Sequence, residues 1–276
     1  MNNYEEQLHF LITNALNEDV GDGDFSTLST IDANKDGKAI LKIKEPCTLA
    51  GVAVAEKIFK MVEPASHFQL YKKDGNAVVV GENAFTVEAK IHTILKCERL
   101  VLNIMQRMSG IATLTGQYTD LLKGYSTKLL DTRKTTPNFR LLEKEAVRIG
   151  GGINHRMGLY DMVMLKDNHI DYSGGIAQAV NNAHEYLHTN KLSLIIEVEA
   201  RTLDDVDEAL NTHKVNRIML DNFSPDNIRL ALKKIDGRVE TEASGGINLQ
   251  NLLEYAATGV DYISSGAVIH LSLIHI

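Results

Sequence analysis

Residues 132–156 carry six basic side chains in a chain that is acidic overall. The formal net charge is −7, yet this stretch contains only two acidic residues, Glu143 and Glu145. The basic residues are Arg133, Lys134, Arg140, Lys144, Arg148 and Arg156. Arg140, Lys144 and Arg148 have helical spacing beside the two glutamates, which predicts a solvated, charged helix face.

The other basic residues in this part of the chain do not follow that spacing. Arginine pairs bidentately with carboxylate or phosphate, and packed cations repel one another unless an anion joins them. The sequence therefore predicts a small-molecule substrate with more than one negative group. The residues expected to converge on it are Arg133, Lys134, His155, Arg156 and Lys166.

Carboxylates at the ends of two later apolar runs predict a second kind of contact. Glu197 and Glu199 are two residues apart, so in a strand they share one face. With Asp221 they can hold Mg²⁺ through water or accept hydrogen bonds from sugar hydroxyls. His155 and His169 belong to no compact His/Cys cluster, so we expect hydrogen bonding to substrate there rather than transition-metal binding.

The last two apolar runs end in small residues, Ser244-Gly245-Gly246 and Ser265-Gly266-Ala267. Small residues let backbone N–H groups approach an anion, and a following helix N-terminus adds its positive dipole end. A phosphate site formed by the last two loops recurs in parallel barrels. These two segments are therefore predicted to bind phosphate.

Apolar runs alternate with amphipathic segments after residue 125, which predicts parallel βα units. The runs are 128–134, 162–168, 194–200, 217–222, 239–246 and 261–267, and the helical segments are 175–188, 202–213, 224–235 and 248–259. Six units are too few for an eight-unit barrel. We predict a reduced, open α/β barrel, with a doubly wound sheet as the alternative; no GxGxxG follows the first strand.

The preceding residues have a different pattern. A helix is expected over 4–17, a polar loop over 18–27, and a long helix over 93–123. Strands are expected over 39–45, 67–73 and 76–91. The sequence thus predicts an α+β sandwich domain over 1–110, followed by the α/β barrel domain over 111–276.

Composition limits the classes of partner. The chain has 276 residues, of which 44% are hydrophobic and 24% charged, as in globular proteins. Its acidity argues against nucleic acid and anionic membranes as partners. Cys47 and Cys97 fit buried free thiols. With neither a signal peptide nor an apolar stretch of about 20 residues, a cytoplasmic protein is expected.

Several of these stretches together resemble the quinolinate phosphoribosyltransferase family, also called nicotinate-nucleotide pyrophosphorylase (carboxylating). They are TRKTTP, GGGINHRMGLYDMVMLKDNHI, EVEA, MLDNF, EASGGI and the EDVGDGDFST loop. The resemblance extends from about residue 13 to about residue 270. It implies an N-terminal α/β sandwich, a reduced open barrel, and conversion of quinolinate and phosphoribosyl pyrophosphate to nicotinate mononucleotide, CO₂ and pyrophosphate with Mg²⁺, in NAD biosynthesis.

The resemblance also implies roles for individual residues, within a homodimer that can assemble further. The quinolinate carboxylates would meet Arg133, His155 and Arg156, together with Arg99 from the neighbouring subunit. Lys134 and Lys166 would face phosphoribosyl pyrophosphate, while Glu199, a better match than Glu197, and Asp221 would act on the ribose hydroxyls and Mg²⁺. The remaining substrate-binding residues would be Thr132, Ser244, Gly245, Gly246, Ser265, Gly266 and Ala267.

Two stretches depart from the family pattern. Asn138-Phe139 stands where the family usually has Gly-Leu, and the ending GAVIHLSLIHI replaces a further helix and a strand. Two alternative functions stay open. One is a paralogue that acts on another aromatic carboxylate, and the other is a non-catalytic phosphosugar-binding protein.

Overall fold

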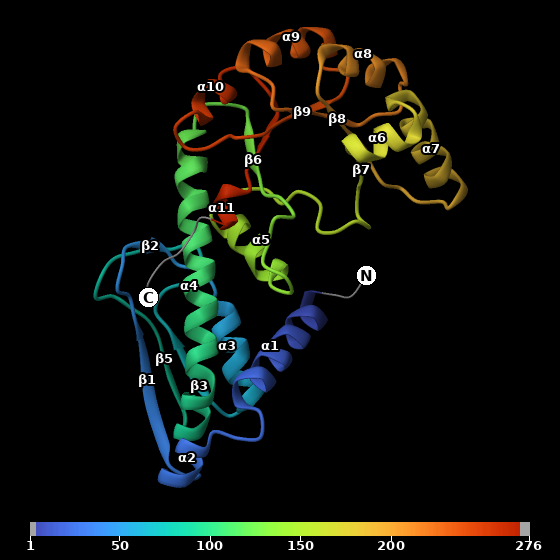
Figure 1. The fold of residues 1–276 in the computed structure, drawn as a ribbon. Coiled ribbons are helices and arrows are strands. Elements are labelled where there is room, and N and C mark those ends of the chain that lie inside the picture. The colour runs from blue at the N-terminus through green and yellow to red at the C-terminus, as the bar shows by residue number, and fades with distance from the viewer. Residues whose placement is uncertain (1–3, 271–276) are drawn as a thin grey trace. The chain divides into compact units, whose positions relative to one another are not determined.

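The computed structural model describes residues 4–270, which form two compact units (Figure 1). The described residues of Met1–Gly116, Thr135–Gly151 and Val268–Ile276 make up the first unit. Gln117–Lys134 and Gly152–Ala267 make up the second. Each unit is therefore made of separate segments of the chain. The predicted single boundary at residue 110 stays a prediction. The last six residues of GAVIHLSLIHI lie outside the described part.

The first unit is built on an antiparallel sheet, as the sequence predicts. Its strands are β1 (Asp36–Lys42), β5 (Asn83–Lys90) and β3 (His67–Leu70), in the order β1-β5-β3. A smaller pair joins β2 (Cys47–Thr48) to β4 (Ala77–Val78). The predicted strand 76–91 is therefore two strands, β4 and β5, separated by a turn in which Gly81 has a φ of 90°.

Helices complete this unit. They are α1 (Tyr4–Val20), α2 (Phe25–Thr30), α3 (Val52–Val62), α4 (Ile91–Leu121), α5 (Arg140–Ile149) and α11 (Ala267–His270). The loop predicted over 18–27 was wrong at both ends, because α1 continues to Val20 and α2 begins at Phe25. The Asp24 side chain accepts a hydrogen bond from Thr27 N at 3.1 Å, and this N-cap starts α2.

The long helix α4 buries one stripe of side chains at helical spacing, including Ile94, Val101, Ile104 and Met108. Arg99 lies on an exposed part of the same helix. Cys47 and Cys97 are both buried free thiols, as predicted, and burial raises the pKa of Cys97 to about 12. Among the described helices, none is long and apolar enough to cross a membrane.

The second unit contains a parallel sheet, six-stranded over the described residues. Its strands are β6 (Lys128–Leu130), β7 (Val163–Leu165), β8 (Ile196–Ala200), β9 (Arg217–Asp221), β10 (Glu240–Ser244) and β11 (Tyr262–Ser264). Their order is β6-β11-β10-β9-β8-β7. Consecutive strands from β7 to β11 are therefore neighbours, β11 also pairs with β6, and β6 and β7 lie at opposite edges. This order confirms the reduced, open barrel and excludes the doubly wound sheet, which would reverse direction within the order.

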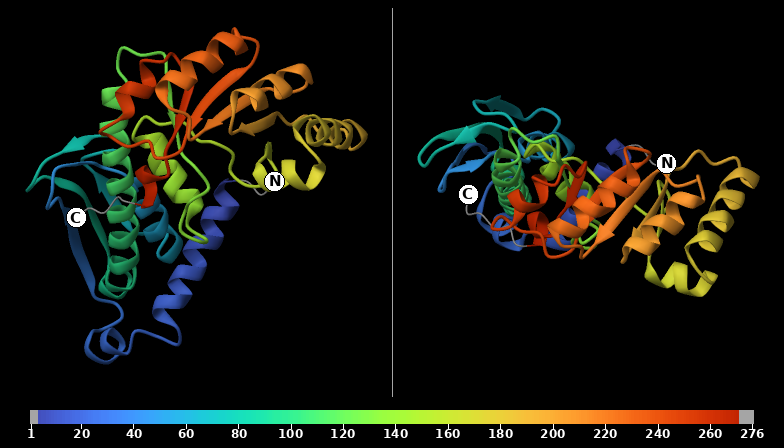
Figure 2. Two further views of the ribbon diagram at one scale, coloured as in Figure 1. Left: turned by 45° about the horizontal axis from the view of Figure 1, so that its top comes forward. Right: turned by 90° about the horizontal axis from the view of Figure 1, so that it is seen from above.

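Helices follow the strands of this sheet. They are α6 (Asp167–Ser173), α7 (Ile176–Thr189), α8 (Leu203–Asn211), α9 (Pro225–Ile235) and α10 (Leu252–Ala256). Figures 1 and 2 show α7, α8 and α9 side by side along one face of the strands. Thr202 and Ser224 are the N-caps of α8 and α9, since their side chains accept hydrogen bonds from Asp205 N and Asn227 N.

The two faces of this sheet differ in chemistry because neighbouring residues of a strand point in opposite directions. One face is apolar and is covered by helices that include α7 and α8; its residues include Val198, Ile218, Leu220, Ala243 and Ile263. The other face carries charge, and the strand register aligns Glu197, Arg217 and Glu240 across three strands. Glu199 and Glu242 align with Met219 between them. The barrel interior is therefore polar.

The solvated helix face predicted around Lys144 is not what forms in α5. Glu143 and Lys144 are fully buried; only Arg148 fits the prediction, pairing with Glu145 at 2.6 Å at the surface. The Glu143 carboxylate accepts hydrogen bonds from Arg107 Nε at 2.8 Å, Thr136 N at 2.8 Å and Thr136 Oγ1 at 2.9 Å. These bonds offset the cost of burying the charge, and local sequence cannot reveal them.

The departure at Asn138 has a cause in the backbone. Asn138 has a φ of 62°, in the left-handed region, just before α5 begins. Glycine adopts this conformation without strain, and asparagine is among the few other residues that tolerate it. Asn138 therefore meets a backbone requirement that a glycine would also meet.

Gly150, which ends α5, is a position where a side chain should destabilise the first unit. A Cβ there would lie 2.5 Å from Ala112 O and 2.7 Å from Thr115 Cβ, both in α4. We expect Gly150→Ala to lower the free energy of unfolding by about 2 kcal/mol through steric overlap. Gly116→Ala is the matched control, because its Cβ would meet nothing closer than 3.8 Å. Because Gly116 lies inside α4, where alanine is more favourable than glycine, Gly116→Ala should raise the free energy of unfolding by about 0.5–1 kcal/mol. Urea unfolding measures both, and equal effects would contradict the packing argument.

Candidate functional site

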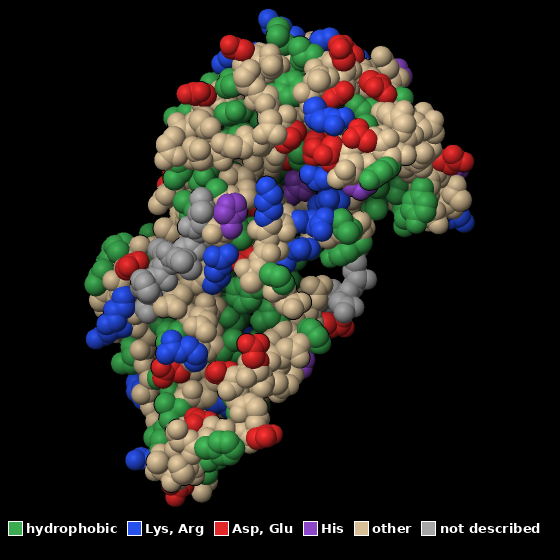
Figure 3. Space-filling model, viewed as in Figure 1, with side chains coloured by type: hydrophobic (Ala, Val, Ile, Leu, Met, Phe, Trp, Pro, Cys, Tyr) green, Lys and Arg blue, Asp and Glu red, His purple; other side chains and the backbone are tan. Residues whose placement is uncertain are grey.

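The predicted site residues, apart from Arg99, all lie in the barrel unit; most are at or near the carboxyl ends of its strands, and His155 and Arg156 lie in the loop between α5 and β7. Asp221 and Ser244 are the last residues of β9 and β10, while Lys166 and Ser265 directly follow β7 and β11. Where Figure 1 places β7 to β9, Figure 3 shows Lys and Arg side chains beside Asp, Glu and His side chains. In parallel α/β folds this edge of the sheet is where ligands bind.

Lysines and carboxylates meet in one cluster at this edge. Lys166 Nζ lies 2.9 Å from Glu199 Oε2. Burial raises the pKa of Asp221, the charge of Glu199 raises it further, and the charges of Lys166 and Lys134 oppose the rise. Four predicted residues from four separate segments thus share one electrostatic neighbourhood. Like charges on Glu199 and Asp221 make it a place where a divalent cation or polar hydroxyl groups would be stabilised.

Two arginines form a second part of the site, where the negative charges of Glu197 and Asp161 also act on Arg156. Arg156 is buried, and Arg133 is half-buried. Burial lowers the pKa of Arg156, and the positive charge of Arg133 lowers it further. Arg156 Nη1 donates a hydrogen bond to Met162 O at 3.4 Å. Two guanidinium groups close enough to repel one another favour an anion that both can contact.

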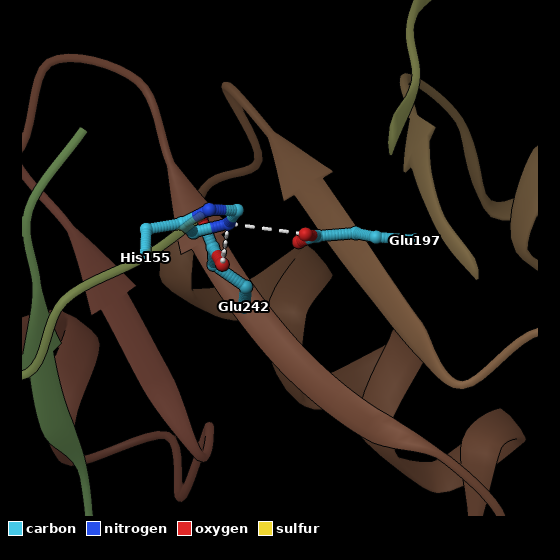
Figure 4. A group of neighbouring side chains, drawn as sticks. All are labelled: His155, Glu197 and Glu242. Carbon is cyan, nitrogen blue, oxygen red and sulfur yellow. Dashed lines mark ion pairs between the residues drawn. The ribbon is translucent and has the colours of Figure 1, made fainter. Parts of the chain in front are cut away.

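His155 lies deeper than the sequence suggests. Its Nε2 is 3.0 Å from Glu197 Oε2 and 3.3 Å from Glu242 Oε2 (Figure 4), and all three side chains are buried. Glu197 and Glu199 share a face as predicted, yet they have different partners: Glu197 faces His155, and Glu199 faces Lys166. These three buried residues could also hold a metal ion, since their ligand atoms lie within 4.8 Å of one another.

The proton in this buried group can be located from its hydrogen bonds. Burial opposes a charged His155, but hydrogen bonds to Glu197 and Glu242 outweigh it and raise the pKa of His155 to about 9. Burial also raises the pKa of Glu197 to about 7. A charged ring would also carry a proton on Nδ1, where the Arg156 N–H lies 2.7 Å away, so this contact opposes the charged form and favours a proton held between Nε2 and the carboxylates. The group therefore keeps less negative charge than two free carboxylates would carry.

The glycine loop after β10 packs tightly against the loop after β9. Gly245 has a φ of 101°, and a Cβ there would lie 2.2 Å from Asn222 Oδ1. The Asn222 amide in turn donates to Asp221 Oδ2 at 2.6 Å. Gly246 has a φ of 65° and open space around it. The expected helix N-terminus does not follow directly, because α10 begins only at Leu252, so backbone N–H groups are what this loop can offer an anion.

The remaining predicted residues have structural contacts of their own. Thr132 Oγ1 accepts the Lys134 N–H at 3.1 Å, and Ser265 Oγ donates to Ile247 O at 3.1 Å. Gly266 and Ala267 are half-buried where α11 begins. His169 is exposed, and its Nδ1 accepts the Lys166 N–H at 3.0 Å at the start of α6.

Sequence reasoning did not single out Glu242 and Arg217. Arg217 pairs with Glu240 at 2.8 Å, lies 3.6 Å from Glu242 Oε2, and stacks over the Tyr262 ring at 4.3 Å. The signal that could have found Glu242 was alternation: Glu240 and Glu242 are polar at every second position of an otherwise buried run, as are Glu197 and Glu199.

Comparisons with known proteins agree in both halves of the chain. The model of the quinolinate phosphoribosyl transferase N-terminal domain matches residues 24–109, and that of its C-terminal domain matches residues 111–274. Quinolinate phosphoribosyltransferase [decarboxylating] 1b of Nicotiana tabacum is 45% identical over 271 residues, covering 93% of this chain and 77% of that protein.

Two further relatives support the same match. The chloroplastic nicotinate-nucleotide pyrophosphorylase [carboxylating] of Oryza sativa subsp. japonica is 43% identical, with 95% of this chain and 74% of that protein covered. The crystal structure of NadC from Streptococcus pyogenes superposes with a TM-score of 0.92 at 37% identity, covering 100% of this chain and 96% of that one.

The two glycines after Ser244 should respond differently to substitution. Gly245→Ala combines left-handed backbone strain with a Cβ only 3.0 Å from the rigid Asn222 N, so we expect a loss of about 3 kcal/mol in the free energy of unfolding. Gly246→Ala has only the strain and should lose about 1 kcal/mol. Denaturant titrations of both variants test this order, and a larger loss for Gly246→Ala would refute it.

Proposed function

The chain belongs to the quinolinate phosphoribosyltransferase family, and on that premise we propose that it is a pentosyltransferase of NAD biosynthesis. It transfers the phosphoribosyl group of phosphoribosyl pyrophosphate to quinolinate and removes one carboxylate, giving nicotinate mononucleotide, pyrophosphate and CO₂. The observation that carries this proposal within the site is the basic Arg133–Arg156 pair in the same barrel unit as the Lys166–Glu199–Asp221 cluster.

The arginine pair suits the dicarboxylate. Each carboxylate of quinolinate can accept two parallel hydrogen bonds from one guanidinium group, worth roughly 1.5–3 kcal/mol per charged bond. The repulsion that lowers the pKa of Arg156 is relieved when two negative charges bind. His155 belongs to this part of the site through its contact with Arg156.

The mixed cluster suits phosphoribosyl pyrophosphate. Lys134 and Lys166 provide positive charge for its phosphates, and Glu199 and Asp221 provide acceptors for ribose hydroxyls. The backbone of Ser244, Gly245 and Gly246 offers N–H groups to the 5′-phosphate. The segment Ser265-Gly266-Ala267 and the loop that contains Thr132 bind the same substrate. Asn222 holds the Asp221 carboxylate in orientation by its hydrogen bond.

Mg²⁺ is the metal we propose for this cluster. Two neighbouring carboxylates fit a hard divalent cation with oxygen ligands, so Glu199 and Asp221 would hold it; burial and the charge of Glu199 raise the pKa of Asp221. When bound with the substrate, it would supply positive charge at the pyrophosphate.

These residues then act mainly by positioning the two substrates and by neutralising charge that develops during the reaction. As the bond from ribose C1 to pyrophosphate breaks, positive charge develops on the sugar, and Glu199 and Asp221 stabilise it. The pyridine nitrogen, held in line by the arginine pair, forms the new bond. The ribosylated ring nitrogen is then an electron sink, so the adjacent carboxylate leaves as CO₂ and a proton takes its place.

An activity assay tests this function directly. Purified protein should release CO₂ from quinolinate only when phosphoribosyl pyrophosphate is present. Nicotinate should have a specificity constant at least about 100-fold lower, because one guanidinium group would remain buried without its carboxylate. A paralogue would turn over another aromatic carboxylate instead, and a phosphosugar-binding protein would bind without CO₂ release. Comparable constants for the two acids would contradict the dicarboxylate site.

We also propose a cytoplasmic homodimer in which Arg99 completes the partner's site. Arg99 is exposed on α4, and none of the salt bridges or side-chain hydrogen bonds found among residues 4–270 includes it. Two buried free thiols support a reducing compartment. In a two-fold dimer each subunit would lend one Arg99 and receive one.

Mixing two inactive variants tests the shared site. Arg99→Ala and Lys134→Ala should each lose activity, since each removes one cation from every site. In a mixed dimer one site carries both defects and the other carries neither. With free exchange about half of the dimers are mixed, so activity should recover to roughly a quarter of wild type. If subunits exchange and no activity returns, Arg99 does not act across the dimer.

A further inference from the structure

The buried carboxylates of Glu197 and Glu242 lie outside the strand-end clusters, yet they connect to them. Both side chains are fully buried, on β8 and β10, and both face His155 Nε2 from the barrel interior (Figure 4). Burying two carboxylates is costly unless they are paired and hydrogen-bonded. The groups that face them are Nε2 of the His155 ring and the Arg217 guanidinium, which lies 3.6 Å from Glu242 Oε2. This part of the interior is therefore an ion-pair network.

Both nitrogens of the His155 ring are engaged within the protein. Nε2 faces the two carboxylates, and Nδ1 accepts the backbone N–H of Arg156 at 2.7 Å. The ring is also almost wholly buried. A ring with both nitrogens occupied has no free polar atom to offer a ligand. What it can do is hold its own orientation and that of the next residue.

The backbone on either side of the ring is held as well. The His155 N–H donates to Asp131 Oδ1 at 2.8 Å, and Asp131 is fully buried directly after β6. Two consecutive amides, those of His155 and Arg156, are thereby anchored to side chains in the barrel. From this anchored backbone the Arg156 guanidinium donates to Met162 O, and the charges of Arg133, Glu197 and Asp161 all act on it. An error of about 1 Å in such a group can cost about 100-fold in rate.

We propose that Glu197 and Glu242 are positioning residues for quinolinate binding, acting through His155 on Arg156. The proposal rests on the function proposed above, because it assigns Arg156 to a carboxylate of the substrate. It differs from the role that the family resemblance implies for His155, which is direct contact with substrate. It also differs from a metal site at the same three residues, because it assigns the two carboxylates to His155 Nε2 and Arg217, which already face them.

Glu242→Gln is the test variant, with Glu240→Gln as the matched control. Both positions are on the same face of β10, and both carboxylates approach Arg217, but only Glu242 faces His155. We expect Glu242→Gln to raise the KM for quinolinate about 10-fold and to leave the KM for phosphoribosyl pyrophosphate within about twofold. Calorimetry on the free protein should show the same loss in quinolinate affinity. Glu240→Gln should change neither constant.

A double-mutant cycle separates action through Arg156 from direct contact by His155. If the carboxylates act through Arg156, Glu242→Gln should have no further effect on quinolinate affinity in an Arg156→Ala background. Additive effects would overturn the proposal, and so would equal rises in both KM values. Glu197→Gln answers the same question should Glu242→Gln fail to fold. If neither folds, the carboxylates serve stability alone and the proposal fails.

Two controls separate the positioning role from a different enzymatic function and from a metal site. Wild-type protein is first assayed for phosphoribosyl pyrophosphate-dependent CO₂ release; its absence would refute the proposed function rather than the positioning role. The unfolding midpoint of wild type is then measured before and after dialysis against a chelator. An unchanged midpoint is expected, and a fall would show a structural metal at His155, Glu197 and Glu242 and overturn the ion-pair assignment.

Discussion

The balance of charge inside the open barrel is the constraint on which the site depends. The inner face of the sheet carries Glu197, Glu199, Glu240 and Glu242, and at least two of these are completely buried. Such a face is stable only where cations reach it, and they come from different places: Arg217 from β9, His155 from a loop, and Lys166 from the end of β7. Folding the sheet therefore also draws the basic loops to its carboxyl edge.

A second requirement is close approach between the loops at that edge. Gly245 lies against Asn222, and Asn222 orients Asp221, so three residues from two strand ends form one packed unit. Asn138 and Gly150, at the two ends of α5, meet similar demands for a left-handed backbone and for missing side-chain volume. At the strand ends of the barrel unit, Gly245 shows why a small residue lies beside the charged Asp221: backbone passes close to the Asn222 side chain that orients this carboxylate.

The site also contains interactions that oppose folding. Arg133 and Arg156 repel one another, as do Glu199 and Asp221. Together with burial, the first repulsion lowers the pKa of Arg156 and the second raises the pKa of Asp221. A protein selected only for stability would lose these pairs. Binding a dianionic acid beside the arginines and a sugar with its cation beside the carboxylates would relieve both repulsions. The deeper ion-pair network differs, because its two carboxylates face His155 and Arg217 of the same chain.

Much of this could be predicted from sequence, because a strand's alternation and the polar residue at its end are local properties. Apolar runs separated by amphipathic helices determined the open parallel barrel, and strand-end residue types indicated Arg133, Lys166 and Asp221. Local pattern also placed Glu197 and Glu199 on one face. It could not tell that one faces His155 and the other Lys166, or that Glu143 is buried against Arg107. Those partners come from segments distant along the chain, and only the tertiary structure, by fixing strand order and loop paths, decides which charges meet.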